Sequence, residues 1–335
     1  MRKEMMQMAK TTPLLLGIGG DSGTGKSTFV GGIYKIFGPE KITNINLDDY
    51  HTFDRVQRKI YGLTALHPAA NNMALMGKHA WQLKKAEKII KPVYDHSTGC
   101  FAEPEEIEPN QIVIIGGLFP FFTQELRDVF DLKVYLDPDE ELKRAWKIHR
   151  DAGRRGYSIE QVMKEIEARQ DDIRRHIEPQ KEYADIIVRF YPPNGTWSPG
   201  DDAHLNVRLF LNRTLPKTGL DELLQEAMGR KTRRAVRLVD EDYYGGPFHT
   251  LEIDGSISPQ TAAGLEQRIW AHLLAPMKLI QDLAPDKLGS FAAGEASGHS
   301  DALALVQLIS IYYLLQAREA RQQAPQEGLA GVAEG

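Results

Sequence analysis

The sequence predicts an α/β fold in three layers, with helices on both faces of a mixed, mainly parallel sheet. Short apolar, β-branched runs alternate with helical patterns through the first 190 residues. That alternation is typical of βαβ units, whose strands lie parallel within one sheet. A glycine-rich loop separates the first apolar run from the first helical pattern. Since such sheets bind ligands at the carboxyl ends of their strands, we expect the site at that edge.

Five apolar runs are expected to form the strands of this sheet. They are LLLGIGG (14–20), KITNINL (41–47), IVIIGG (112–117), LKVYLD (132–137) and ADIIVRF (184–190). Amphipathic segments between them predict helices over 71–90, 139–153 and 158–176. Asp139 and Ser158 stand at the starts of the last two helices, where their side chains can accept hydrogen bonds from free backbone N–H groups.

A Pro- and Gly-rich stretch, YPPNGTWSPGDD from residue 191, interrupts this alternation. Beyond it the sequence predicts short strands at 205–211 and 248–255, and helices near 259–283 and 301–320. We expect a core over 1–195, a C-terminal α/β extension packed on the core over 196–322, and a disordered tail over 323–335. The tail is expected because it offers almost no aromatic or β-branched bulk.

Composition and charge argue against several classes of protein. The 335 residues are 42% hydrophobic and carry a formal net charge of −5, which disfavours general affinity for nucleic acid or anionic membranes. The run IVIIGGLFPFF is shorter than the roughly 20 residues that span a bilayer, and the first residues hold no apolar run of signal-peptide length. The single cysteine, Cys100, allows no internal disulfide. We expect a cytoplasmic protein that holds anionic substrates through local clusters of Arg and Lys.

The segment GGDSGTGKST carries the G-x-x-x-x-G-K-S pattern of a phosphate-binding loop between a predicted strand and a predicted helix. Its glycines let successive backbone N–H groups turn toward phosphate oxygens, and the helix adds its positive N-terminal end. Lys26 should reach the β- and γ-phosphates, with the Ser27 hydroxyl on Mg²⁺. The alternative is a turn that merely joins strand to helix. The expected nucleotide-binding residues are Gly20, Asp21, Ser22, Gly23, Thr24, Gly25, Lys26, Ser27 and Thr28.

Two further segments concentrate charge. NLDDYHTFDRVQRK places acids at a strand end and cations after them, and WKIHRDAGRRGYS places cations at a helix end and in the following loop. A carboxylate in the first could take the proton of an attacking hydroxyl, and cations could hold a second phosphate or the transferring phosphoryl group. The alternatives are a solvated turn and a helix C-terminus that favours cations through its dipole. The residues concerned are Asp48, Asp49, His51, Arg55, Arg58, Lys59, Lys147, Arg150, Arg154 and Arg155.

Six ordered blocks of the sequence resemble a known family. GDSGTGKST, NLDDYHTFDRVQRK, TALHPAANN, PVYDHSTG, WKIHRDAGRRGYS and EPQKEYADIIV are similar to blocks of the phosphoribulokinase and uridine kinase family of P-loop kinases. The likeness is dense over about 15–190 and weaker beyond. DRVQRK and TALHPAANN favour the phosphoribulokinase branch. The resemblance implies a three-layer P-loop kinase fold similar to adenylate kinase, with ATP and Mg²⁺ as cofactors and a homodimer as the assembly.

The resemblance also implies the reaction and the roles of residues. It implies phosphorylation of ribulose 5-phosphate, a small-molecule sugar phosphate, at O1, as in the Calvin cycle. Asp48 would be the catalytic base, and Ser27 and Asp48 would hold the metal. Lys147, Arg150 and Asp151 would line the transfer site. The substrate-binding residues would be His51, Arg55, Arg58, Lys59, Tyr94, His96 and Arg155.

Two positions depart from the family pattern. Thr24 stands where plant-type members carry a redox cysteine, so thiol regulation of that kind cannot operate. Gly116 stands where members typically have a glutamate that supports the metal. Three interpretations therefore stay open: an active phosphoribulokinase with a modified metal site, helped by Asp49 or Asp21; a related sugar or nucleoside kinase; and a pseudokinase that binds without turnover. A P-loop GTPase is disfavoured, because the guanine-reading pattern Asn-Lys-x-Asp occurs nowhere in the sequence.

Overall fold

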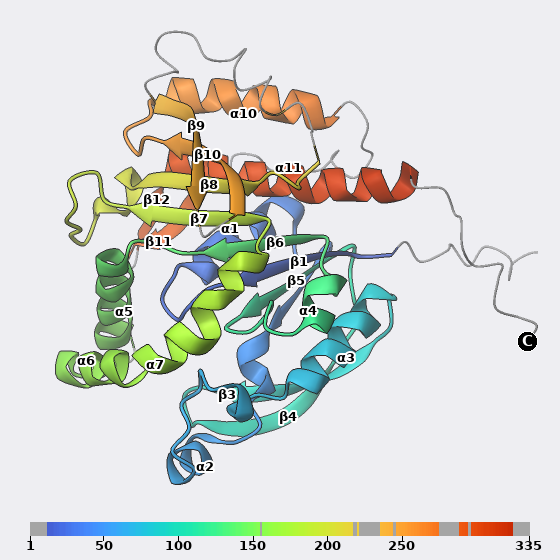
Figure 1. Cartoon of the computed structure of the whole chain (residues 1–335), viewed down its shortest axis with the longest axis vertical. Helices are drawn as coiled ribbons and strands as arrows, with labels where there is room; N and C mark the ends of the chain where they lie inside the picture. The colour runs from blue at the N-terminus through green and yellow to red at the C-terminus, as the bar shows by residue number, and fades with distance from the viewer. Residues whose placement is uncertain are drawn as a thin grey trace, which may run out of the picture.

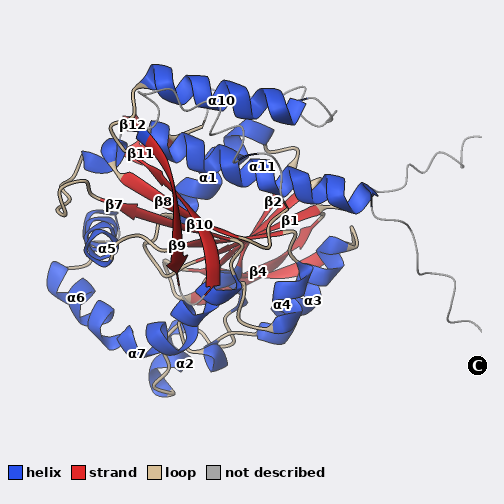
Figure 2. Cartoon of the chain, turned by 45° about the horizontal axis from the view of Figure 1, so that its top comes forward, coloured by secondary structure: helices blue, strands red, loops and turns tan. Residues whose placement is uncertain are grey.

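A mixed eight-stranded sheet forms the centre of the molecule, and helices cover both of its faces (Figure 1, Figure 2). The computed structural model describes residues 12–154, 156–216, 220, 235–243, 246–274, 288–293 and 296–323. The strand order is β2-β5-β1-β6-β7-β8-β10-β9. The first five strands of that order run parallel, and the remaining pairings are antiparallel.

The five parallel strands coincide with the five predicted runs. They are β1 (Leu14–Gly19), β2 (Ile42–Asn46), β5 (Ile112–Gly117), β6 (Leu132–Leu136) and β7 (Ile186–Tyr191). Both faces of the central strands are buried: Ile112 and Ile114 face one hydrophobic cluster, and Val113 and Ile115 face the other. Burial on two faces explains why these strands read as continuous apolar runs.

The predicted helices of the first half are present with two corrections, and the structure adds the short helices α2 and α4, which were not predicted. The helices of this half are α1 (Lys26–Phe37), α2 (Arg55–Ile60), α3 (Met73–Lys84), α4 (Gln124–Val129), α5 (Glu140–Arg154), α6 (Ile159–Ala168) and α7 (Gln170–Asp172). The helix predicted over 71–90 ends early, because Ala86 adopts a positive φ of 59° and reverses the chain. The helix predicted over 158–176 is broken after Ala168 and continues as α7 and a π-helical turn, η3 (Ile173–Ile177).

The two predicted helix starts carry their expected hydrogen bonds. Asp139 accepts from the Glu141 backbone N–H through Oδ1 at 3.1 Å. Ser158 accepts from the Gln161 N–H at 3.2 Å, and the Gln161 side chain accepts from the Ser158 N–H, which completes a capping box.

Short elements lie between β2 and β5 and before β7. They are the hairpin β3 (Ile89–Asp95) and β4 (Cys100–Ile107), and the helical turns η1 (Leu47–Tyr50), η2 (Pro68–Ala70) and η4 (Glu178–Tyr183). The hairpin was not predicted. Its second strand is exposed along most of its length and lacks the apolar alternation that marks a half-buried strand.

The C-terminal half continues the same sheet. Its elements are η5 (Asp201–His204), β8 (Asn206–Asn212), β9 (Val236–Tyr243), β10 (Gly246–Ile253), α10 (Pro259–Leu274), β11 (Ser290–Ala293), β12 (Ala296–His299) and α11 (Asp301–Gln323). β8 pairs directly with β7, so the boundary predicted near residue 195 falls between two neighbouring strands. The predicted tail lies outside the described residues, apart from Gln323 at the end of α11.

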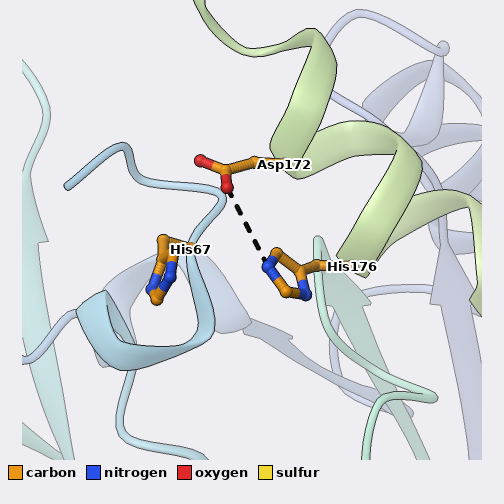
Figure 3. Close-up of side chains that lie close together, drawn as sticks. All are labelled: His67, Asp172 and His176. Atoms are coloured by element: carbon orange, nitrogen blue, oxygen red, sulfur yellow. Dashed lines mark ion pairs between the residues drawn. The ribbon is translucent and has the colours of Figure 1, made fainter.

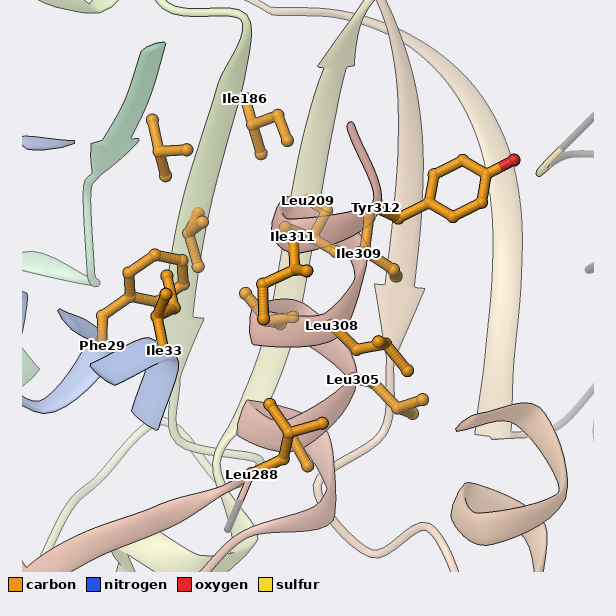
Figure 4. Close-up of a cluster of buried hydrophobic side chains, with 14 of the residues drawn as sticks. Phe29, Ile33, Ile186, Leu209, Leu288, Leu305, Leu308, Ile309, Ile311 and Tyr312 are labelled. Atoms are coloured by element: carbon orange, nitrogen blue, oxygen red, sulfur yellow. The ribbon is translucent and has the colours of Figure 1, made fainter. Parts of the chain in front are cut away.

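The last helix packs against the first. Phe29 and Ile33 of α1 share one buried cluster with Leu305, Leu308 and Ile309 of α11 (Figure 4). Gln307 of α11 donates through Nε2 to the Phe29 carbonyl at 3.2 Å and accepts from the Gly289 N–H at 2.8 Å. None of the described helices combines the length and hydropathy that crossing a membrane requires.

Candidate active site

The phosphate loop joins β1 to α1 at the carboxyl edge of the sheet, as expected. Gly20, with φ 144°, allows a close approach, because a Cβ there would lie 2.7 Å from the Leu136 carbonyl oxygen. Gly23, with φ 91°, packs against Lys147 of α5, whose Cβ would lie 3.2 Å from an added Cβ. Thr24 is buried and donates to the Asp21 carbonyl at 2.9 Å, so its hydroxyl holds the loop closed.

Lys26 reaches back across this loop. Its Nζ donates to the carbonyls of Gly20 and Asp21, at 2.8 and 2.7 Å. Burial lowers the pKa of Lys26, while the carboxylates of Asp48 and Asp21 act in the opposite direction. Asp48 therefore lies within electrostatic range of the lysine that would hold the transferring phosphate.

Asp48 sits in η1, directly after β2. The Asn46 side chain caps this turn by accepting from the Asp48 N–H at 3.1 Å. Its neighbour Asp49 has a different environment: Oδ2 binds Lys91 at 2.6 Å and Oδ1 accepts from the Tyr94 N–H at 3.1 Å. Asp49 thus anchors β3, whereas Asp48 acts electrostatically on both Lys26 and His51.

His51 is buried beside the hairpin of β3 and β4. Its side chain is held by Asn71, whose Oδ1 lies 2.9 Å from Nδ1. Its ring meets Tyr94 edge-on, with centroids 4.7 Å apart, and His96 lies beyond at 6.4 Å. Burial and the positive charge of Arg58 lower the pKa of His51 to about 4, so the ring is neutral at pH 7.

The three cations of the segment DRVQRK, Arg55, Arg58 and Lys59, differ in burial and in their contacts. Arg58 is buried, donates to the Phe53 carbonyl at 2.7 Å and to the Tyr94 hydroxyl at 2.9 Å, and lies over the Tyr94 ring. Arg55 donates to the His96 carbonyl. Lys59 is exposed. Arg55, Arg58, Tyr94 and His96 are therefore assembled by direct contacts around His51.

A second cationic group lies on α5. Lys147 and Arg150 both bind Asp151, each at 2.8 Å. Although burial opposes ionisation, the hydrogen bonds from Arg150 and Lys147 lower the pKa of Asp151 to about 2. Asp151 thus holds two cations in place. Arg155 lies outside the described residues, so the role expected for it stays a prediction.

Sequence reasoning missed two residues that shape the site. Lys143 lies 3.6 Å from the Asp21 carboxylate and lines a small recess between the phosphate loop and α5–α7, together with Lys147 and Arg169. Asn71 orients His51. Lys143 lies four residues before Lys147, so the two share one face of the predicted helix, and this spacing could have indicated Lys143. The block TALHPAANN already contained Asn71.

The open position at the end of β5 is Gly116. It pairs in register with Ile18 and Asn46, and a Cβ added to it would come no closer than 3.6 Å to any neighbour. Gly117 differs, because its Cβ would lie 2.7 Å from that of Leu47. The exposed Ser27, on the first turn of α1, and Asp48 both carry oxygen donors. Their chemistry would suit Mg²⁺, which prefers oxygen ligands and often takes only one or two carboxylates.

Comparison with known proteins agrees with this geometry. Residues 15–196 match the model of the phosphoribulokinase/uridine kinase family. The chain belongs to this family. A phosphoribulokinase of Synechocystis sp. is 47% identical over 179 residues, which are 53% of this chain and 54% of that protein. A chloroplastic phosphoribulokinase of Mesembryanthemum crystallinum is 41% identical over 273 residues, which are 72% of this chain and 68% of that protein.

Family members of both branches match the chain. A uridine kinase of Bacillus pumilus is 33% identical over 187 residues, which are 53% of this chain and 87% of that protein. The solved phosphoribulokinase from Rhodobacter spheroides superposes with a TM-score of 0.57 at 18% identity, covering 81% of this chain and 98% of that one. The expected family and the expected P-loop kinase fold are confirmed.

Proposed function

We propose that this protein transfers the γ-phosphoryl group of ATP to O1 of D-ribulose 5-phosphate, giving ribulose 1,5-bisphosphate and ADP. The relatives named phosphoribulokinase support this choice, since one of them is 41% identical across 72% of the chain. The observation that carries the proposal is the position of Asp48. It acts electrostatically both on Lys26 in the phosphate loop and on His51 among the substrate-side residues.

In the proposed reaction Asp48 accepts the proton of the O1 hydroxyl. O1 then forms a bond to the γ-phosphorus, the bond from that phosphorus to the β,γ-bridging oxygen breaks, and ADP leaves with the electron pair. Lys26, Lys147 and Arg150 would neutralise the charge on the transferring group. His51, Arg55 and Arg58, together with Tyr94 and His96, would hold the sugar phosphate, and Lys59 and Arg155 would contribute further positive charge.

Ser27 and Asp48 would hold Mg²⁺, which when bound neutralises charge on the β- and γ-phosphates. Asp151 would act through its neighbours: by holding Lys147 and Arg150 it sets the position of two cations. The proposed cytoplasmic location and homodimeric state rest on the sequence and on the family resemblance. Size-exclusion chromatography coupled to light scattering tests the second.

A second candidate is an impaired kinase that binds both ligands. It is favoured by Gly116, which leaves the end of β5 without a carboxylate. A uridine kinase is a further alternative, because a uridine kinase matches over 87% of its own length.

The decisive experiment measures ADP release from MgATP with ribulose 5-phosphate, with uridine, and without an acceptor. Robust turnover with the sugar phosphate alone would support the proposal, and turnover with uridine alone would replace it. Asp48→Asn should lose turnover by about a hundredfold or more while nucleotide binding survives. Asp128→Asn, an exposed acid on α4, is the matched control. Unchanged turnover in Asp48→Asn would remove Asp48 from the role of base.

A further inference from the structure

Two histidines and a carboxylate from distant parts of the chain converge between η2 and η3 (Figure 3). His67 caps η2, Asp172 ends α7, and His176 lies on the π-helical turn η3. One possible ligand atom from each of the three lies within 4.8 Å of those from the others. Nε2 of His176 is 3.9 Å from Oδ1 of Asp172, and the two imidazole rings have centroids 5.4 Å apart.

This set of donors has the chemistry of a transition-metal site. Two imidazoles and one carboxylate, with a fourth position left for water, are a common ligand set for Zn²⁺. Bonds of about 2.0–2.1 Å in a tetrahedral site place ligand atoms roughly 3.3 Å apart, so the donors must approach one another by about an ångström. Side-chain rotation suffices, because the side chains of His176 and Asp172 are only partly buried, at 23% and 17% exposure.

The surroundings of Asp172 also suit a ligand. The Thr64 hydroxyl donates to Oδ2 at 2.6 Å, which fixes the carboxylate and leaves Oδ1 on the side of His176. Hydrogen bonds of this kind orient metal-binding carboxylates. The backbone of His176 is held as well, since its carbonyl accepts from Gln180 Nε2 at 2.9 Å.

One contact has to change on binding. Nδ1 of His67 accepts from the Ala69 N–H at 3.2 Å, so the neutral ring carries its proton on Nε2 in this arrangement. Coordination through either nitrogen would give up that hydrogen bond. Ala69 is exposed, and water can take over its N–H. The cost is therefore that of exchanging one exposed hydrogen bond.

We propose that His67, Asp172 and His176 bind one Zn²⁺-like divalent cation, with water completing the coordination. The ion would join the segment Thr64–Asn71 to the helical run α7–η3. That segment also reaches the substrate side, because Asn71 donates to the His67 carbonyl at 3.0 Å and holds the His51 ring at 2.9 Å. An occupied site would stabilise the fold and fix the orientation of His51.

The test is metal binding to the chelator-treated full chain without nucleotide. Zn²⁺ is titrated by calorimetry, and Co²⁺ is followed by visible absorption, which reports tetrahedral coordination. We expect one equivalent to bind and the thermal midpoint to rise with Zn²⁺. His67→Asn, His176→Asn and Asp172→Asn should each weaken binding by about a hundredfold or more, since loss of even an outer-shell partner costs about 10–100-fold.

Two variants serve as matched controls. His299→Asn removes a histidine that pairs with Asp301 at 3.1 Å, and His149→Asn removes an exposed histidine of α5 whose ring lies 6.2 Å from that of Trp197. Both should keep full affinity. The proposal fails if the unmodified chain takes up no stoichiometric ion, or if either control loses as much affinity as His176→Asn. Should a histidine variant not fold, Asp172→Asn decides, because its amide keeps the shape and an acceptor for Thr64.

Discussion

Arg150 of α5 donates through Nη2 to the hydroxyl of Ser22 in the phosphate loop, 3.2 Å away. The same guanidinium binds Asp151 through Nε at 2.8 Å. A cation from a distant helix is therefore already placed at the loop, and its carboxylate partner lies on its own helix. This arrangement pre-positions positive charge where it would be needed during phosphoryl transfer.

Arg150→Ala should lower kcat by about 10²–10³-fold, because one pre-positioned donor to the developing charge is lost. ATP affinity should change far less, since Lys26 and the loop backbone remain. Steady-state kinetics with nucleotide binding measured separately provide the readout. Lys164→Ala, an exposed residue of α6, is the control. Weaker ATP affinity with kcat unchanged would show that Arg150 serves only ground-state binding.

His51→Asn should raise the KM for the sugar phosphate by about 10–100-fold, the range for a hydrogen bond to a charged group, and leave the KM for ATP unchanged. With its pKa lowered to about 4, His51 is neutral throughout pH 5.5–9. The unmodified enzyme and the variant should therefore show parallel pH profiles of this KM. An inflection near pH 6.5 in the unmodified enzyme alone would mean that His51 titrates there.

Gly116→Glu should fold normally, because a Cβ at this position meets its nearest neighbour at 3.6 Å. If the added carboxylate reaches the ion, the concentration of Mg²⁺ that gives half-maximal turnover should fall. Gly117→Ala is the steric counterpart, since its Cβ would lie 2.7 Å from the Leu47 Cβ. It should destabilise the fold by about 1–3 kcal/mol. A thermal midpoint lowered equally by both changes would contradict this difference.

Glu266, on α10, should make the stability of the fold depend on pH. Burial and the negative charge of Asp301 raise its pKa to about 7, although His299 acts in the opposite direction. The unfolded chain ionises this group near pH 4.5, so its contribution to stability is lost as pH rises from there through 7. The free energy of unfolding in urea should be measured for the unmodified protein and for Glu266→Gln. After allowance for solvent screening, the difference between the two proteins should be about 1–2 kcal/mol larger at pH 8 than at pH 5. Glu182→Gln, at an exposed acid, should show no such difference.

Strands buried on both faces were predictable from the sequence, and strands exposed to solvent were not. β5 reads as an unbroken apolar run, while β4 carries charged residues along its exposed length. The break after Ala168 also left no clear local signal, because the segment that follows, up to Ile177, contains neither Gly nor Pro. We attribute the break to tertiary packing, because Ile173 and Ile177, the first and last residues of η3, are both buried.

At the candidate site, the sequence motif indicated phosphate binding, whereas the orientation of the other side chains depends on tertiary contacts. The phosphate loop was readable because spacing alone fixes its backbone. The different environments of Asp48 and Asp49 depend on Lys91, more than 40 positions away in the sequence. Likewise, His67 and His176 meet only when η2 and η3 come together, which no periodicity reveals.

The packing of α11 on α1 has a consequence for synthesis of the chain. Phe29 and Ile33 follow the phosphate loop, but α11, which packs against them, lies far later in the sequence. At usual elongation rates the chain from β7 to the end of α11 takes on the order of ten seconds to appear. During that interval the nascent chain already contains the phosphate loop, but the apolar side chains of Phe29 and Ile33 have no α11 to cover them. The nascent chain should therefore depend on the ribosome exit region or a chaperone until α11 emerges.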